Sequence, residues 1–335
     1  MATIKDIANK LGVSISTVSK GLNGAHDISD EMRKLVLDTA IELGYASKKI
    51  KSRKNHKLCI LIDGMEHSTP DQFGYDIVLG FKQAAASSNW NVDVIEVDSD
   101  IKNSDNYDSY IVKKNYQGAF LLGFNMHDNW IKQLNTTIIP TVTIDNYIDG
   151  NPKVGTVGTD SFEGIGAAIT HLAKLGHTRI AFLNGDKNSQ VSRDRNQAFE
   201  YYLNQHNIPI IPELIRYGYY VVDSARDHVP MFIEHKATAI VCASDMIASG
   251  VINELTRLGI RVPEDMSVIG FDDLPIASKL TPSLTTIRQD RKNIGKSAYL
   301  LLDGLINDVA ISKMVLRAKF IERASIGKCN NKYTI

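Results

Sequence analysis

From residue 58 almost to the end of the chain, short apolar runs alternate with amphipathic helical patterns. This alternation restricts the possible folds more than any other feature of the sequence, because it is typical of βαβ units with parallel strands. The predicted strands are LCILI (58–62), VDVIEV (92–97), GAFLLG (118–123), TVTI (141–144), RIAFLNG (179–185), TAIVCAS (238–244) and SVIGFDD (267–273). The helical segments between them include 161–175, 193–206 and 245–258.

The pattern restarts near residues 154–180, and it holds too many units for one small sheet. We therefore predict an α/β core (58–335) of two doubly wound parallel-sheet lobes, similar to periplasmic binding proteins and joined by crossover strands. The predicted N-lobe spans about 58–157 and 288–310, and the C-lobe about 158–287 and 311–328. Ligands of such sheets bind outside the carboxyl ends of the strands, so a cleft between two lobes would collect side chains from several strand ends.

Residues 3–45 carry the pattern of three short helices. Thr3 and Asp6 have the spacing of a capping box, Gly12 is suited to end the first helix, and Ser14 is suited to cap the second. Two helices joined by a tight turn that contains glycine are the helix-turn-helix pattern. The third helix is predicted between a cap at Ser29 and a stop at Gly44, with an apolar stripe of Met32, Leu35, Val36, Thr39, Ala40 and Leu43.

The second predicted helix has two different faces. Val13, Val18 and Leu22 are predicted to face inward, which leaves Ile15, Ser16, Ser19 and Lys20 outward. An exposed Ile15 could contact a thymine methyl, and Lys20 could reach guanine or a phosphate. Each residue also has a plainer interpretation, the hydroxyls as helix caps and Lys20 as a solvated charge.

Charge is distributed unevenly along the chain. The whole sequence has a formal net charge of zero, yet residues 1–57 hold eleven basic and six acidic residues. We predict a helix-turn-helix head (1–46) followed by a basic hinge (47–57). The hinge is either a solvated flexible linker or, as we favour, a segment that lies on phosphates.

Cysteine usage and hydropathy restrict the class further. The three cysteines are too few and too scattered for a disulfide framework or a zinc site, and Cys59 and Cys242 fall within strand-like runs where they are expected to be buried. The N-terminal residues lack the apolar core of a signal peptide, and no apolar run is long enough to span a membrane. We therefore expect a cytoplasmic, nucleoid-associated protein.

Motifs along nearly the whole chain are similar to those of lactose-repressor-type (LacI/GalR) transcriptional regulators. They are TIKDIANKLGVSISTVSKGLNG and ISDEMRKLVLDTAIELGY in the head, then GFKQAA, GAFLLG, HLAKLGHTRIAFLNG, SDMIASGVINELTRLGIRVPEDMSVIGFDDLP, TPSLTTIRQD and RASIG, in family order. The resemblance implies a repressor that binds near-palindromic operators as a homodimer or tetramer, with its second helix in the major groove. It implies an effector bound between the lobes that changes their closure and the spacing of the two heads.

By position, the resemblance makes Ile15, Ser16 and Lys20 base-reading residues. The other residues it implies in DNA binding are Thr3, Ser14, Thr17, Ser19, Asn23 and Tyr45 in the head and Lys48, Lys49, Ile50, Lys51 and Arg53 in the hinge. The sequence departs from the family at position 20, which is commonly Arg, and in the hinge, where Lys54 stands at the usual position of an intercalating Leu. We therefore expect more phosphate contact and less wedging into the minor groove, with Ile50 as the one apolar candidate.

Polar residues at strand ends indicate a ligand site. Asp145 and Asp272 end strand runs, Ser244-Asp245 ends another and opens a helix, and Arg195 lies early in the helix after FLNG. Carboxylates with a forked Arg suit a polyol, although each of these residues could instead be a cap or an ion-pair partner. The resemblance matches Asp145, Arg195, Ser244 and Asp272, together with Phe73 and Tyr75, to effector-binding positions.

These residues favour a sugar or sugar derivative as effector, with a purine, a nucleoside or a phosphoprotein as alternatives in the same class of regulator. A solute-binding protein of a transporter is a further alternative, which the head and the missing signal peptide argue against. The sequence holds no dinucleotide-binding fingerprint after the first strand, no nucleophile elbow, no P-loop and no zinc-protease motif. We therefore predict neither an enzyme nor a cofactor or metal site.

Overall fold

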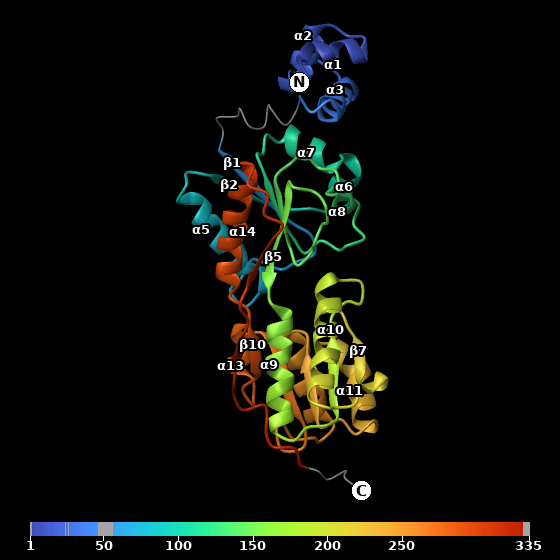
Figure 1. The fold of residues 1–335 in the computed structure, drawn as a ribbon, viewed down its shortest axis with the longest axis vertical. Helices are drawn as coiled ribbons and strands as arrows, with labels where there is room; N and C mark the ends of the chain where they lie inside the picture. Colours follow the sequence, from blue (N-terminus) through green and yellow to red (C-terminus); the bar gives the residue numbers. More distant parts are fainter. Residues whose placement is uncertain (1, 24, 26, 46–55, 331–335) are drawn as a thin grey trace. The chain divides into compact units, whose positions relative to one another are not determined.

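The computed structural model describes residues 2–23, 25, 27–45 and 56–330 (Figure 1). The chain divides into two compact units. The first unit comprises residues 1–65, 77–157 and 292–314, and the second unit comprises 66–76, 158–291 and 315–335. Residues 66–76, predicted as part of the N-lobe, thus belong to the second unit. The chain returns to the first unit after residue 291 and passes again to the second after residue 314, each about four residues later than predicted.

The head consists of α1 (Ile4–Leu11), α2 (Ile15–Asn23) and α3 (Asp30–Glu42). The predicted caps are confirmed: Thr3 and Asp6 form a reciprocal capping box, and Gly12 ends α1 in the left-handed conformation. The Ser14 hydroxyl accepts from the Thr17 N–H at 3.0 Å, and Ser29 caps α3. The small core of the head is formed by Ile7, Ala8, Val18, Val36 and Ala40.

One member of the predicted α3 stripe is not part of this core. The Leu35 side chain is 48% exposed, whereas Val36 and Ala40 are fully buried. With 3.6 residues per turn, the six residues of the predicted stripe cover a wide strip of the α3 surface. The short helices α1 and α2 cover only part of that strip. Leu35 lies at the edge of the stripe and remains accessible to solvent.

The first sheet has the strand order β11-β5-β4-β3-β1-β2. Its strands are β1 (Lys57–Ile62), β2 (Asn91–Glu96), β3 (Ala119–Leu122), β4 (Thr141–Ile144), β5 (Val154–Thr159) and β11 (Lys313–Leu316). The pairs from β2 to β5 are parallel. The accompanying helices are α5 (Phe73–Ala86), α6 (Ser99–Ser104), α7 (Tyr107–Lys113), α8 (Asn129–Gln133) and α14 (Arg291–Ile306). Helices α5 and α14 lie on one face of this sheet and α6–α8 on the other (Figure 1).

The second sheet has the order β12-β10-β9-β8-β6-β7. Its strands are β6 (Ile180–Asn184), β7 (Ile215–Tyr217), β8 (Ala239–Cys242), β9 (Ser267–Asp272), β10 (Thr285–Arg288) and β12 (Lys319–Ile321), the last antiparallel to β10. Its helices are α9 (Ser161–Lys174), α10 (Gln190–Gln205), α11 (Ser224–Glu234), α12 (Asp245–Arg257) and α13 (Pro275–Lys279), with the 3₁₀ turn η1 (Pro212–Leu214). Helix α9 packs against α10, and α11 against α12.

The two sheets repeat one doubly wound topology. Reading outward from β2 and from β7, the first five strands follow the same order, and the direction of winding reverses between β1 and β3 and between β6 and β8. These reversals are the switch points at which doubly wound sheets bind ligands. All seven predicted strands are present, and Cys59 and Cys242 are fully buried as predicted, which raises the pKa of both thiols.

A buried histidine fixes the C-terminal residues to the amino end of the second sheet. His177 is 2% exposed; its ring nitrogens lie 2.9 Å from the Thr238 hydroxyl and 3.0 Å from the Gly327 carbonyl oxygen. Burial lowers the pKa of His177, because the imidazolium loses its hydration there.

This lowered pKa predicts a pH dependence of stability. The folded state binds fewer protons than the unfolded chain, so stability is complete above the pKa of an unfolded histidine, about 6.5, and is lost as the pH falls below it. The free energy of unfolding of the wild type should therefore fall between pH 7.5 and pH 5. We expect a smaller fall in His177→Gln, measured by urea denaturation. The exposed His127→Gln is the control, and an equal flattening in both variants would contradict the assignment.

Candidate functional sites

Helix α2 presents a polar face with one large apolar side chain. Val18 is fully buried, whereas Ile15 is 53% exposed and Ser16 and Lys20 are exposed. The structure therefore places the three residues that match base-reading positions on one solvent-facing surface of α2. Such a surface offers an apolar contact, a hydroxyl and a cation, which together suit the edges of base pairs.

Other residues predicted to contact DNA have roles within the head. Thr3 and Ser14 are helix caps, and the Ser14 and Thr17 hydroxyls lie 2.8 Å apart. Tyr45 packs against the core of the head, and Lys20 forms an ion pair with Asp27. The Asn23 side chain and the hinge residues Lys48, Lys49, Ile50, Lys51 and Arg53 lie outside the described residues.

A buried arginine lies at the carboxyl edge of the second sheet. Arg195, on α10, is 3% exposed; it donates to the Ala243 carbonyl oxygen at 2.6 Å, and its guanidinium carbon lies 3.8 Å from the centre of the Phe271 ring. Its Nε lies 3.4 Å from the Ser161 hydroxyl. No carboxylate among the described residues forms an ion pair with it. A guanidinium has five N–H donors, so this cation has capacity for a ligand.

Asp272, at the end of β9, is held in an unusual backbone conformation. Its φ is +117°, and the following Asp273 has φ +55°, both in the region that favours glycine. The Asp272 carboxylate is 6% exposed and accepts from the Gln289 amide at 2.7 Å. Backbone strain of this kind persists where surrounding contacts fix it, and it is concentrated at ligand sites.

Asp245, which the sequence places beside Ser244 at a strand end, is one of the groups that fix this turn. It is fully buried at the start of α12 and accepts from the Leu274 N–H at 2.7 Å and from the Thr286 hydroxyl at 2.6 Å. Burial, and then the neighbouring charge of Asp272, raise its pKa well above the usual range. Asp245 thus ties the strained turn at Asp272 to β10.

Gln289 was missed, because the strand before it, TTIR, mixes polar and apolar residues and was not predicted. Arg291 is a third buried polar residue of this region: it donates to the Gln72 carbonyl oxygen at 3.0 Å and lies 3.0 Å from the Asp76 carboxylate. These contacts attach residues 66–76 to the second unit. The rule that polar side chains follow parallel strands would have found Gln289, had β10 been recognised.

The remaining predicted effector residues differ in setting. Ser244 is 4% exposed, and its hydroxyl accepts from the Ile247 N–H as the cap of α12. Phe73 and Tyr75 are partly exposed in residues 66–76 of the second unit. Asp145 belongs to the first unit, where it follows β4 with φ +55° and donates its N–H to the Val157 carbonyl oxygen. Arg195, Ser244 and Asp272 therefore share the carboxyl edge of the second sheet.

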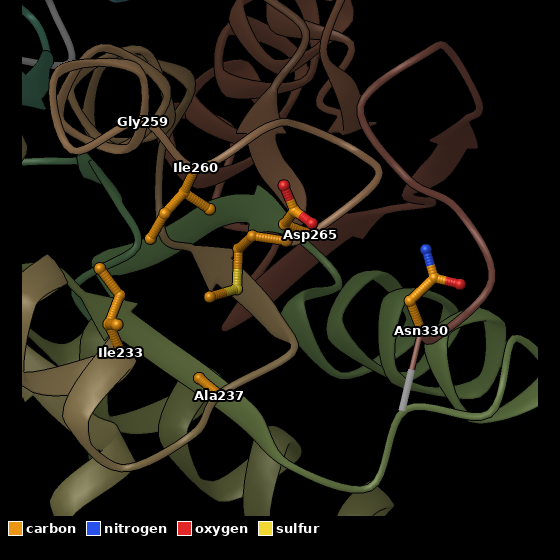
Figure 2. Close-up of a pocket in the computed structure, with 7 residues that line it drawn as sticks. Ile233, Ala237, Gly259, Ile260, Asp265 and Asn330 are labelled. Carbon is orange, nitrogen blue, oxygen red and sulfur yellow. The ribbon is translucent and has the colours of Figure 1, made fainter. Parts of the chain in front are cut away.

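A cavity of about 220 Å³ lies at the opposite, amino edge of this sheet (Figure 2). It is lined by Ile233, Ala237, Gly259, Ile260, Asp265, Met266 and Asn330. Asp265, its one charged residue, already pairs with Arg261 at 2.7 Å. This cavity contains none of the predicted effector residues.

The described part of the chain has neither a membrane-spanning helix nor a cluster of metal-ligating side chains. No described helix has the length and apolarity needed to cross a membrane. Within the same residues, no group of three or more His, Cys, Asp or Glu side chains is arranged to hold a metal ion.

Residues 3–48 match the family model of bacterial regulatory proteins, lacI family, and residues 169–326 match that of the periplasmic binding protein-like domain. The probable HTH-type transcriptional repressor ExuR of Bacillus subtilis (strain 168) is 30% identical, in an alignment that covers 97% of this chain and 98% of the relative.

Solved structures agree in fold. A transcriptional regulator CelR–cellobiose complex superposes with a TM-score of 0.73 at 24% identity, covering 97% of this chain and 100% of the other. A lac repressor dimer bound to operator and the anti-inducer ONPF gives a TM-score of 0.69 at 23% identity, covering 97% and 99%. Both likenesses extend over the head and the two sheets.

Proposed function

The chain belongs to the lacI family of bacterial regulatory proteins, and on this premise we propose that it is a repressor whose affinity for operator DNA is set by a small molecule. The DNA-binding element is the head, with α2 in the major groove. The effector site includes Arg195 and Asp272 at the carboxyl edge of the second sheet, where Gln289 supports Asp272, and Phe73 and Tyr75 of the same unit are further contacts.

The observation that carries the DNA-binding proposal is the division of α2 into a buried face and an exposed reading face. Ile15 is apolar and 53% exposed, whereas Val18 of the same helix is fully buried in the core of the head. A thymine methyl is a matching apolar partner in the major groove. We further propose that the protein binds as a homodimer, so that two heads read the two halves of a near-palindromic operator.

The chemistry around Arg195 supports a polyhydroxyl effector. The Arg195 guanidinium stacks on Phe271 and offers several donors in one plane, and Asp272, the residue after Phe271, offers carboxylate acceptors; vicinal hydroxyls can satisfy both. A sugar or sugar derivative is therefore the proposed effector class. The cellobiose named in the complex of a similar fold is consistent with this class.

Selection of operators from a random duplex library tests the DNA-binding proposal. We expect enrichment of a near-palindromic sequence, and we expect Ile15→Ala to weaken binding to it about tenfold, the scale of one lost base contact. The variant should bind a mixed-sequence duplex as the wild type does, because Ile15 carries no charge for phosphates. Fluorescence anisotropy provides both measurements.

Leu35→Ala is the matched control, since Leu35 is a similar side chain, 48% exposed, on α3. An equal loss in both variants would contradict the role of Ile15. A library from which no sequence is enriched would contradict the proposed function, and an enriched site without two-fold symmetry would contradict the dimer.

A further inference from the structure

The reading face of α2 carries a cation that is already paired. The Lys20 ammonium forms an ion pair with the carboxylate of Asp27, which lies in the turn between α2 and α3. The side chains are 46% and 61% exposed. The hydrogen bond from Lys20 also holds the pKa of Asp27 below its usual range, so the carboxylate is charged wherever the protein is folded at neutral pH.

The turn that carries Asp27 is anchored on both sides. The Ala25 N–H donates to the Lys20 carbonyl oxygen at 3.1 Å, and the Arg33 guanidinium donates to the Ala25 carbonyl oxygen at 2.8 Å. Ser29 then caps α3. The backbone therefore keeps Asp27 close to the end of α2 and within reach of Lys20.

This pair has little value for folding but a definite consequence for DNA binding. Exposed ion pairs contribute little to stability, because water screens the charges. A carboxylate on a surface that meets DNA, however, repels the phosphates. A phosphate that approached Lys20 would meet the charge of Asp27 and would have to displace it.

A guanine edge meets no such repulsion. Its O6 and N7 are neutral acceptors, and an ammonium has three N–H donors, so Lys20 can donate to guanine while it remains paired with Asp27. A lysine on its own is a point charge that binds phosphates without sequence preference, unlike an arginine with its planar fork. A carboxylate fixed beside the ammonium weakens its attraction for phosphates but leaves N–H donors for a guanine edge.

Resting on the proposed DNA-binding function, we propose that Asp27 is a specificity-determining residue, which withholds Lys20 from phosphates and directs it to base edges. Loss of the Asp27 charge should release Lys20 for phosphate binding. The protein would then bind DNA of any sequence more tightly and would discriminate less.

The test compares Asp27→Asn with Glu42→Gln in the full-length protein. Glu42 also pairs with a lysine of the head: its carboxylate lies 2.5 Å from the Lys10 ammonium, and the Glu42 and Lys10 side chains are 66% and 42% exposed. Each substitution therefore removes one negative charge from a similar exposed ion pair. The probe is a mixed-sequence 24-base-pair duplex, titrated by fluorescence anisotropy between 50 and 300 mM KCl.

We expect Asp27→Asn to tighten non-specific binding several-fold and to steepen the plot of log K against log salt by about one, as one further phosphate contact requires. Glu42→Gln should leave this slope unchanged. In a Lys20→Gln background, Asp27→Asn should no longer change the slope, because the cation it releases is absent. Asp27→Ser serves as a second variant, and thermal melts confirm that each variant is folded.

Equal slopes for Asp27→Asn and Glu42→Gln would overturn the proposal, as would an effect of Asp27→Asn that persists without Lys20. A wild type that fails to bind the duplex even at 50 mM KCl would instead contradict the proposed function. The two failures are therefore distinguishable.

Discussion

Substitution of Asp245 by leucine is expected to lower the free energy of unfolding by about 2–5 kcal/mol. The Leu274 N–H and the Thr286 hydroxyl would lose their acceptor inside the second unit, and an unsatisfied buried donor costs about 1–3 kcal/mol. The strained turn at Asp272 would lose its tie to β10 at the same time. Urea denaturation at neutral pH measures the change.

Asp245→Asn separates the hydrogen bonds from the charge. Because burial and Asp272 raise the pKa of Asp245, the folded state binds more protons than the unfolded chain, and the wild type loses stability as the pH rises above the pKa of an unfolded aspartate, about 3.9. Asparagine carries no charge, so its destabilising effect relative to wild type should be largest near pH 4 and smaller at pH 7. A difference that stays constant or grows with pH would contradict the raised pKa.

Glu254→Gln is a suitable control for this pH dependence. Its hydrogen bond with Arg257, also on α12, lowers the pKa of Glu254, so the linkage has the opposite sign. Stability from this pair is present above the pKa of an unfolded glutamate and is lost as the pH falls. The two variants on one helix should therefore show opposite trends with pH.

The parts of the fold that the sequence predicts are those decided by local chemistry. Thr3 with Asp6, Gly12 and Ser14 satisfy the backbone groups at helix ends in the way their residue types dictate. The buried parallel strands are continuous apolar runs such as LCILI, which few other structures accommodate. Strands β5, VGTVGT, and β10, TTIR, are buried too, but their glycines and threonines carry no such signal.

The candidate site was predictable where a polar residue follows a recognisable strand, as Asp272 does. The same pattern indicates Asp245 beside Ser244, but not its partners Leu274 and Thr286, which are 29 and 41 residues further along the chain and which only the tertiary fold brings to it. The pairing of Lys20 with Asp27 depends likewise on the course of a turn. Residue type and spacing indicate which side chains have chemistry to offer, whereas their partners are set by topology.

Substitution of Arg195 by methionine is expected to weaken effector binding strongly while leaving the fold nearly as stable. Truncating one partner of a buried, hydrogen-bonded charge costs about 2–5 kcal/mol of binding free energy, or a loss of affinity of roughly 30-fold to several thousand-fold. Arg195→Lys should also bind poorly, because an ammonium lacks the planar fork and the stacking on Phe271.

Stability should respond differently from binding. Arg195 is a buried cation without a carboxylate partner among the described residues, so its removal relieves a desolvation cost that offsets the lost hydrogen bonds to Ala243 and Ser161. We expect the free energy of unfolding of Arg195→Met to lie within about 1–2 kcal/mol of wild type, since these effects oppose each other and are each of that size. A residue that served only the fold would show the reverse, with stability lost and binding retained.

A thermal-shift screen of monosaccharides, disaccharides and purines on the wild type identifies the ligand, and calorimetry on the variants then measures its affinity. Arg179→Met is the matched control, because Arg179 also donates to a carbonyl oxygen, that of His235, but lies before β6 at the amino end of the same sheet. If the shift persisted in Arg195→Met, or if Arg179→Met lost it equally, the effector site would not include Arg195. A purine hit that depends on Arg195 would keep the site and replace the sugar, and a screen in which no compound raises the wild-type Tm would contradict both effector classes.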